Sequence, residues 1–217
     1  MDNPIGYYWN SRLNSLAEAL EANNFEVFIA ENTIDAKKIV TEKIIPELNP
    51  ASISWGGSMT FTGTGLYEYL ISQDKIAVID PAEKDISLEE KMERRRKALL
   101  VDLYFTGSNA VTEDGSLVNL DMIGNRIAAL TFGPKNVVVL VGRNKITVDL
   151  EEAMNRIKDY AAPVNAIRVG LKNPGVETGL CSDCKTPQRI CNIWSIIEGH
   201  MYEGRIHVKL IGETLGY

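Results

Sequence analysis

All three cysteines of the 217-residue chain lie in one short segment, GLCSDCKTPQRICN, at residues 179–192. Cys181 and Cys184 form a Cys-x2-Cys pair whose thiolates can reach one metal ion, and Cys191 follows after six further residues. Cysteines that only fill a core are expected among apolar residues, whereas this segment is polar and carries cations that favour the thiolate. We therefore predict a metal or cluster site on the three cysteines, with a redox dithiol or structural thiols as the alternatives.

The number of sulfur ligands leaves the identity of the metal open. A structural zinc site takes four protein ligands, so a fourth would have to come from Asp183, His200 or His207. An iron–sulfur cluster held by three cysteines would leave one iron open to a substrate or to a ligand from a partner protein. Both an iron–sulfur cluster and zinc therefore stand as candidate cofactors.

A glycine-rich loop, Gly56-Gly57-Ser58-Met59-Thr60, follows the expected strand at 51–55. Gly56 and Gly57 allow the backbone to approach a ligand closely, and Ser58 and Thr60 offer hydroxyls at the start of a helix. This arrangement predicts a site for a phosphate or a carboxylate. A tight turn with a Ser/Thr cap is the alternative.

A second polar loop, at 106–126, is rich in side chains that can bind a polyol or a carboxylate. We predict that Arg126 pairs with an acidic ligand, with Asn109 and Asn125 beside it. Glu113 and Asp121 are the nearby carboxylates that could transfer protons. Turn preferences alone would explain the Asp-Gly pair in this loop, but not the full set.

A third loop, VGRNKI, would bring Lys145 to the same place as a positive charge, although an exposed lysine is the alternative. The three loops converge if the strands before them are parallel, because ligands bind beyond the carboxyl ends of parallel strands. We also expect the sulfur ligands of the cysteine segment to share a cleft with the glycine-rich loops.

The hydrophobic pattern predicts the elements that would hold the loops. Helical patterns at 9–24, 33–48 (ending near Pro46), 88–100 and 149–162 (with Pro163 after its end) alternate with short strands. Strands separated by crossover helices predict an α/β fold with a mostly parallel sheet covered on both sides. Residues 193–212 are expected to form a C-terminal β-hairpin, and the whole chain, 1–217, a single domain.

Composition narrows the class of protein. A net charge of −6 argues against a nucleic-acid partner, and no apolar run approaches the roughly 20 residues that span a bilayer. The first residues, MDNPIGYYWN, lack the pattern of a signal peptide, so we expect a cytoplasmic protein with reduced thiols.

Five motifs together resemble the lactate-utilisation (LUD) domain family in its short single-domain form, over nearly the whole chain. They are SWGGSMT, TGSNAVTEDGSLVNLDMIGNRIAALTFGP, VGRNKI, AAPVN and CSDCKTPQRICN. The resemblance implies a Rossmann-related three-layer α/β/α fold of the ribose-phosphate isomerase and CoA-transferase-like superfamily. It also implies a part in the oxidation of lactate or a similar small hydroxy acid, favours an iron–sulfur cluster over zinc, and suggests protein partners in a redox complex.

A more distant similarity links TGSNAVTEDGSLVN to methylthioribose-phosphate isomerases, but Asn109 stands where that family has an acid. The preferred hypothesis is therefore a component of lactate utilisation that binds a small anionic metabolite and, if it is an enzyme, belongs to an oxidoreductase. The alternatives are a sugar-phosphate isomerase or acyl transferase with structural cysteines, and a non-catalytic metabolite-sensing subunit. A homo-oligomer is possible in each case.

Overall fold

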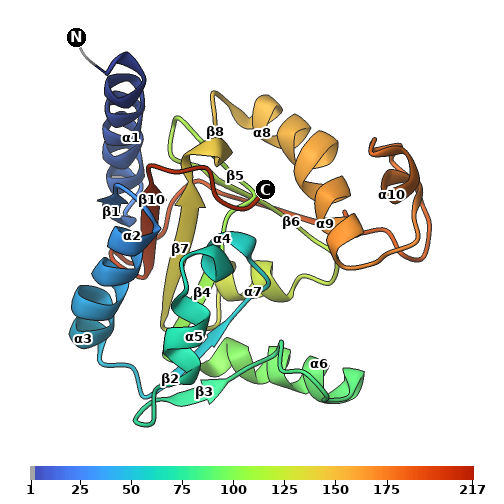
Figure 1. Cartoon of the computed structure of the whole chain (residues 1–217), viewed down its shortest axis with the longest axis horizontal. Helices are drawn as coiled ribbons and strands as arrows, with labels where there is room; N and C mark the ends of the chain where they lie inside the picture. Colours follow the sequence, from blue (N-terminus) through green and yellow to red (C-terminus); the bar gives the residue numbers. More distant parts are fainter. Residues whose placement is uncertain (1–2) are drawn as a thin grey trace.

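The main sheet of the computed structural model, which describes residues 3–217, has six strands, all parallel to their neighbours. Their spatial order is β1 (Glu26–Ala30), β10 (Ile206–Ile211), β7 (Asn136–Gly142), β4 (Leu103–Gly107), β2 (Ser52–Trp55) and β3 (Ala77–Ile79). Helices cover both faces, as Figure 1 shows. The predicted α/β class and mostly parallel sheet are confirmed.

A second, smaller sheet is mixed. Its order is β8 (Ile146–Thr147), β5 (Ala110–Thr112), β6 (Leu117–Asp121) and β9 (Ile193–Ile197). β5 and β6 form an antiparallel hairpin around Asp114-Gly115, a residue pair that is typical of hairpin turns.

The expected C-terminal β-hairpin at 193–212 is wrong. β9 pairs with β6 in the small sheet, whereas β10 lies between β1 and β7 in the large one. All residues of β10 are buried, as a strand with neighbours on both edges requires, while β9 is partly exposed. Two adjacent apolar strands carry no local signal that distinguishes pairing with each other from pairing with separate sheets.

The helical segments follow the predicted order with small differences. They are α1 (Pro4–Ala22), α2 (Thr33–Ile39), η1 (Val40–Ile44), α3 (Ile45–Leu48), α4 (Met59–Gly63), α5 (Leu66–Ile71), α6 (Leu88–Lys97), η2 (Ala98–Leu100), α7 (Asn125–Thr131), η3 (Arg143–Lys145), α8 (Leu150–Arg156), η4 (Ile157–Ala161), α9 (Ala162–Arg168) and α10 (Pro174–Thr178). Within residues 3–217, no helix combines the length and the apolar character that crossing a bilayer requires.

Two prolines lie inside helices. Pro46 is near the end of its helix, as predicted, but Pro163 lies within α9 rather than after the end of the preceding helix. A π turn comes before each of them, so that the N–H preceding the proline donates to the carbonyl five residues earlier. Proline lacks an N–H and clashes with the carbonyl four residues back, and the wider turn avoids both problems.

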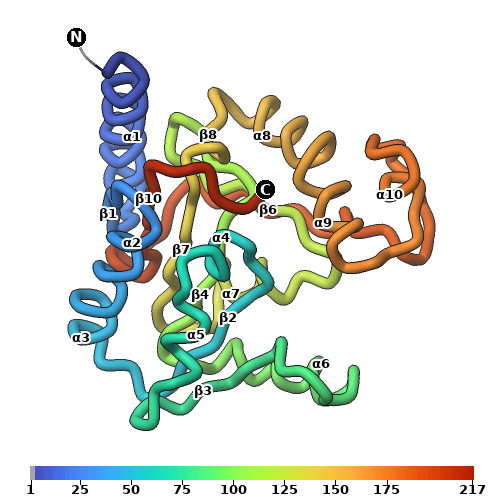
Figure 2. Tube along the Cα trace, in the orientation of Figure 1, coloured from blue at the N-terminus to red at the C-terminus, as the bar shows by residue number. Residues whose placement is uncertain are grey.

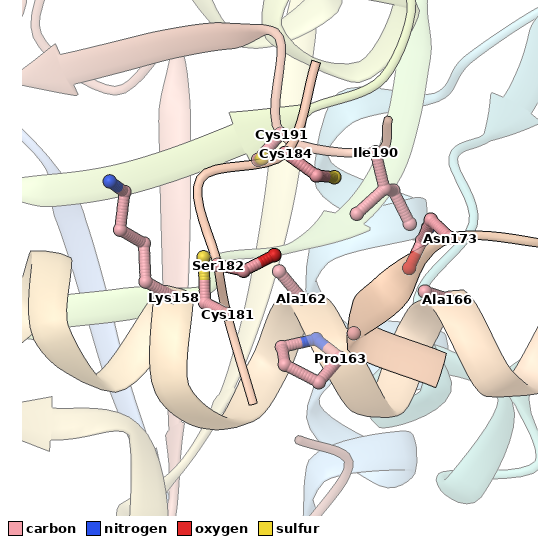
Figure 3. Close-up of a pocket in the computed structure, with 11 residues that line it drawn as sticks. Lys158, Ala162, Pro163, Ala166, Asn173, Cys181, Ser182, Cys184, Ile190 and Cys191 are labelled. Atoms are coloured by element: carbon pink, nitrogen blue, oxygen red, sulfur yellow. The ribbon is translucent and has the colours of Figure 1, made fainter. Parts of the chain in front are cut away.

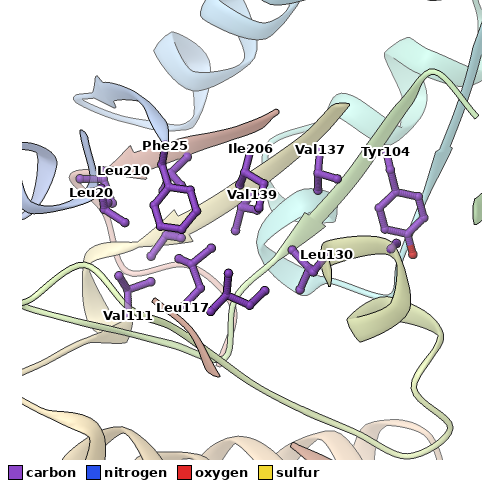
Figure 4. Packing of buried hydrophobic residues seen from close by; sticks show 14 of the residues in the cluster. Leu20, Phe25, Tyr104, Val111, Leu117, Leu130, Val137, Val139, Ile206 and Leu210 are labelled. Atoms are coloured by element: carbon purple, nitrogen blue, oxygen red, sulfur yellow. The ribbon is translucent and has the colours of Figure 1, made fainter. Parts of the chain in front are cut away.

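The core is divided by the large sheet. Along β7, Val137 and Val139 face one side with α1 and the small sheet, and Val138 and Leu140 face the other side with α2 to α5. Figure 4 shows the first cluster, with Phe25 between strands of both sheets. A third cluster packs α8 and η4 against β5 and β6 and includes Cys191. This packing fixes the positions of the loops at the carboxyl ends of the strands.

Candidate functional site

The loops after β2, β4 and β7 lie together, as the parallel sheet predicts. A Cβ atom on Gly107 would lie 2.7 Å from Ser58 Oγ and 3.0 Å from the carbonyl oxygen of Leu140, so a glycine is needed for this close approach. Ser58 caps α4, since its Oγ accepts the N–H of Phe61. Beside it, Gly57 borders open space, because a Cβ there would meet no atom within 4 Å.

Lys145 is buried at the centre of these loops. Its Nζ donates to Thr60 Oγ1 at 2.7 Å and to the carbonyl oxygen of Ser108 at 3.1 Å. Both partners are neutral, and the third N–H of the ammonium has no hydrogen-bond partner among residues 3–217. The three loops expected to converge therefore do so around an ammonium group without a paired carboxylate.

Burial, together with the smaller effect of the nearby cations Arg156 and Arg126, lowers the pKa of Lys145 to about 7. Desolvation disfavours the charged form of the amine, and like charges add to that effect. The ammonium is therefore balanced near neutrality between its charged and neutral forms. An arriving anion would stabilise the charged form.

Residues 213–217 lie over Lys145. The trace after β10 crosses β7 toward α4 (Figure 2), and Thr60 Oγ1 donates to the carbonyl oxygen of Leu215 at 3.2 Å. Asn144 holds the same segment with two hydrogen bonds, to the N–H of Leu215 at 2.9 Å and to the carbonyl oxygen of Gly216 at 3.2 Å. The position of a Cβ on Gly216 would be 3.5 Å from Lys145 Nζ.

Arg126 is fully occupied by partners within the chain. Each of its five N–H donors has an acceptor, and the guanidinium is buried. The acceptors are Oδ1 of Asp121, Oδ1 of Asn109, Oδ1 of Asn119, and the carbonyl oxygens of Gly107 and Leu120. Arg126 therefore holds the 106–126 loop in place. It gives the site a positive charge, but all its N–H donors are already used within the chain.

The two predicted proton-transfer groups are separated. Asp121 accepts the backbone N–H groups of Arg126 and Ile127 at 3.0 Å each, so it caps α7 as well as pairing with Arg126. Glu113 lies at the other end of the β5–β6 hairpin, where it pairs with Arg12 of α1 at 2.8 Å. Asn125 is half-buried at the start of α7, and Gly56 packs against Tyr104 and Arg126.

The three cysteines line one narrow pocket of about 30 Å³ between the cysteine segment and α9. Figure 3 shows their sulfur atoms around this space, with Pro163 and Ala162 below them. Among residues 3–217, however, no three His, Cys, Asp or Glu side chains are grouped closely enough to hold one ion. The donor set suits a thiophilic metal or a cluster, although the sulfur atoms do not surround a common point in this conformation.

Arg189 organises the pocket. It donates to Cys191 Sγ at 3.1 Å and to the carbonyl oxygen of Cys184 at 3.1 Å, and this contact with Cys191 raises the pKa of Arg189. Lys158 also lines the pocket and pairs with Asp183.

The cysteine pocket and the Lys145 site are neighbours, but the expectation that the cysteines share a cleft with the glycine-rich loops is wrong. Asn192 donates its N–H to the carbonyl oxygen of Asp121 at 3.1 Å and its side chain to that of Met122 at 3.0 Å. The pocket itself is lined by residues from 158 to 191 and by none of the glycine-rich loops. His200 and His207 lie outside it: His200 Nδ1 bonds within its own turn, and His207 Nδ1 faces Glu26.

The contacts of three residues in the two sites cannot be read from the sequence. Ser108 contributes a backbone carbonyl, which its residue type does not reveal. Arg156 donates to the carbonyl oxygens of Asn109 and Asn144, on residues more than ten positions away. Arg189 was recognised as a cation, but its contact with Cys191 depends on the turn between them. For Arg156, the one signal in the sequence is its position on the inner face of α8, and that position by itself would favour an apolar residue.

Comparison with known proteins supports the fold and the family. No curated protein matches the sequence. A crystal structure of a DUF162 family protein from Deinococcus radiodurans superimposes with a TM-score of 0.52 and 11% identity, over 94% of this chain and 97% of that chain. At this identity the likeness shows the fold. The family model of the LUD domain matches residues 13–211, which confirms the resemblance seen in the motifs, and the chain therefore belongs to the LUD domain family.

Proposed function

We propose that the protein takes part in lactate utilisation, as its family suggests in general terms, by binding a small 2-hydroxy carboxylate at the carboxyl ends of β2, β4 and β7. The buried Lys145 supports this most strongly. Its ammonium form has neutral hydrogen-bond partners, one N–H without a partner among residues 3–217 and two further cations nearby, so an anion would supply the missing countercharge.

The donors available favour a single carboxylate over a polyphosphate. Lys145 has one N–H left, and Arg126 has none, so the site offers charge but few hydrogen bonds. Ser58 adds a hydroxyl on the side of α4, and the open space beside Gly57 gives a direction of approach. A carboxylate with one adjacent hydroxyl matches this set in charge and in the number of hydrogen bonds.

The cysteine segment would hold a metal or an iron–sulfur cluster through Cys181, Cys184 and Cys191. A cluster bound by three cysteines has one iron open to substrate or to a partner protein, and it would supply electron transfer or Lewis acidity. Closure of the segment around the metal would be coupled to binding, as in other thiolate sites. Protein partners in a redox complex would then receive or deliver the electrons.

A non-catalytic metabolite-binding subunit is the second candidate. Asp121 is paired with Arg126, and Glu113 is at the far end of the hairpin, so the two carboxylates do not face one ligand. A subunit that binds the acid and leaves the chemistry to a partner would need no such pair. Turnover of bound lactate with an electron acceptor distinguishes the two.

Calorimetric titration with L-lactate tests the proposed site. We expect binding by the wild-type protein, loss of binding in Lys145→Met, and no change in the matched control Lys135→Met, because Lys135 is exposed and pairs with Asp102. Elemental analysis of protein purified without oxygen tests the cysteine site. Iron or zinc that is lost in Cys184→Ser is expected, and equal metal content in both proteins would contradict it.

A further inference from the structure

The Lys145 amine has the environment of a nucleophile. Its Nζ is buried between Thr60 Oγ1 and the carbonyl oxygen of Ser108, and no carboxylate fixes its charge. Lysines that attack carbonyl carbons are desolvated or lie next to other cations, and both conditions hold here. Arg126 and Arg156 are the nearby cations.

We propose that Lys145 forms an imine with the carbonyl carbon of a small 2-oxo acid, the oxidised counterpart of the 2-hydroxy acid. This inference rests on the proposed function, because the same site must admit the acid. The nitrogen lone pair adds to the carbonyl carbon, the carbon–oxygen π bond breaks, and the oxygen takes up a proton to give a carbinolamine. Loss of water then gives the imine, so that no oxidant or reductant is consumed.

The groups around Nζ suit each part of this step. Thr60 Oγ1 and the carbonyl oxygen of Ser108 accept hydrogen bonds from the amine and orient its nitrogen, and the proton that nitrogen loses on addition passes to the substrate's carbonyl oxygen. Arg126 and Arg156 offset the carboxylate charge of the acid. With a pKa of about 7, the amine is neutral in a substantial fraction of molecules near neutral pH.

Access to the amine depends on residues 213–217. Leu215 and Gly216 lie over Lys145, and Asn144 holds both by their backbone groups. Removing this side chain in Asn144→Ala takes away two hydrogen bonds without touching Lys145. We therefore expect the substitution to speed the reaction by exposing the amine.

Reductive trapping tests the inference. The full-length protein is incubated with pyruvate, treated with borohydride and analysed by mass spectrometry of the intact chain and of its peptides. We expect one carboxyethyl group on the peptide that contains Lys145, its loss in Lys145→Arg, and its retention in Lys135→Arg. In Asn144→Ala the adduct should form several-fold faster. Circular dichroism verifies that the variants are folded, and L-lactate, which has no carbonyl carbon of this kind, serves as the unreactive control.

The outcomes separate this inference from the proposed function. If the wild-type protein binds L-lactate by calorimetry but pyruvate labels Lys145 no more than exposed lysines, the imine is refuted and the binding site stands. If neither acid binds and no adduct forms, both fail. If the Lys145→Arg variant does not fold, labelling of Lys145 but not of the exposed lysines in the wild-type protein still supports the imine.

Discussion

Lys145 Nζ lies 2.7 Å from Thr60 Oγ1, and this hydrogen bond joins the loop after β7 to helix α4 across the carboxyl ends of the sheet. The two residues are 85 positions apart, and among residues 3–217 no carboxylate pairs with Lys145. Their contact places an ammonium group where the fold gathers its glycine-rich loops. The predictions below concern this site and the buried charges that support it.

The pair formed by Asp121 and Arg126 should be important for stability. We expect Asp121→Asn to lower the free energy of unfolding by about 3 kcal/mol, because it leaves a buried guanidinium without its countercharge. Denaturant unfolding measures the loss. In a double-mutant cycle with Arg126→Met, the double variant should lose much less than the sum of the single variants. Additive losses would mean that the two side chains act independently.

Two glycines of the site should respond differently to alanine. Gly107→Ala should cost about 1–3 kcal/mol, because the new Cβ would press on the backbone carbonyl of Leu140. Gly57→Ala should leave stability unchanged or slightly raised, since the new methyl meets no atom within 4 Å. If the ligand approaches over Gly57, this stable variant should nevertheless bind L-lactate more weakly. Unchanged affinity would place the approach elsewhere.

Lys209 should reduce stability at neutral pH. It is fully buried on β10 with no hydrogen-bond partner among residues 3–217, and burial lowers its pKa from 10.5 to about 6. Between these values the unfolded chain binds more protons than the folded one, so this residue makes stability rise with pH. Lys209→Met should therefore stabilise the protein by about 1–4 kcal/mol near pH 7, an effect that diminishes toward pH 10.

Thermal unfolding at several pH values measures this difference. Phe28 lies against the Lys209 ammonium and recovers part of the cost through a cation–π contact, which keeps the expected gain modest. Lys43 lies over the same ring but is closer to the surface, so Lys43→Met is the matched control. A Lys209→Met variant that is less stable than the wild type at pH 7 would show that the contact outweighs desolvation.

Much of the fold was accessible from local sequence. A continuous apolar run such as NVVVLVG predicts a strand buried on both faces, and β7 is that strand in the interior of the large sheet. Ser87 followed by Glu90 is the pattern of a capping box, and Ser87 Oγ accepts the N–H of Glu90 at the start of α6. Hydrophobic periodicity and helix caps depend on residues close in sequence, so they can be predicted without the tertiary structure.

The roles of the site residues were less accessible, because they depend on partners far along the chain. Arg126 was predicted from its type as a ligand-binding group, yet its donors meet Gly107 and Asn109, 19 and 17 positions away. The sequence leaves open whether Lys145 lies in the site or on the surface. Its burial results from residues 215–216, which cross over it. The residues adjacent to Arg126 and Lys145 in the sequence do not indicate these contacts. The three cysteines, in contrast, are close in sequence and do line one pocket.

The pH dependence of L-lactate affinity tests the central claim most directly. Because the free Lys145 amine has a pKa of about 7 and a bound carboxylate favours its charged form, affinity should fall by about tenfold per pH unit above neutrality. Lys145→Arg keeps its charge throughout this range, so its affinity should not change with pH. Calorimetric titrations from about pH 6 to about pH 9 should show this contrast. A wild-type affinity that is constant over this range, or an equal slope in both proteins, would contradict the assignment of Lys145 as the anion-binding group.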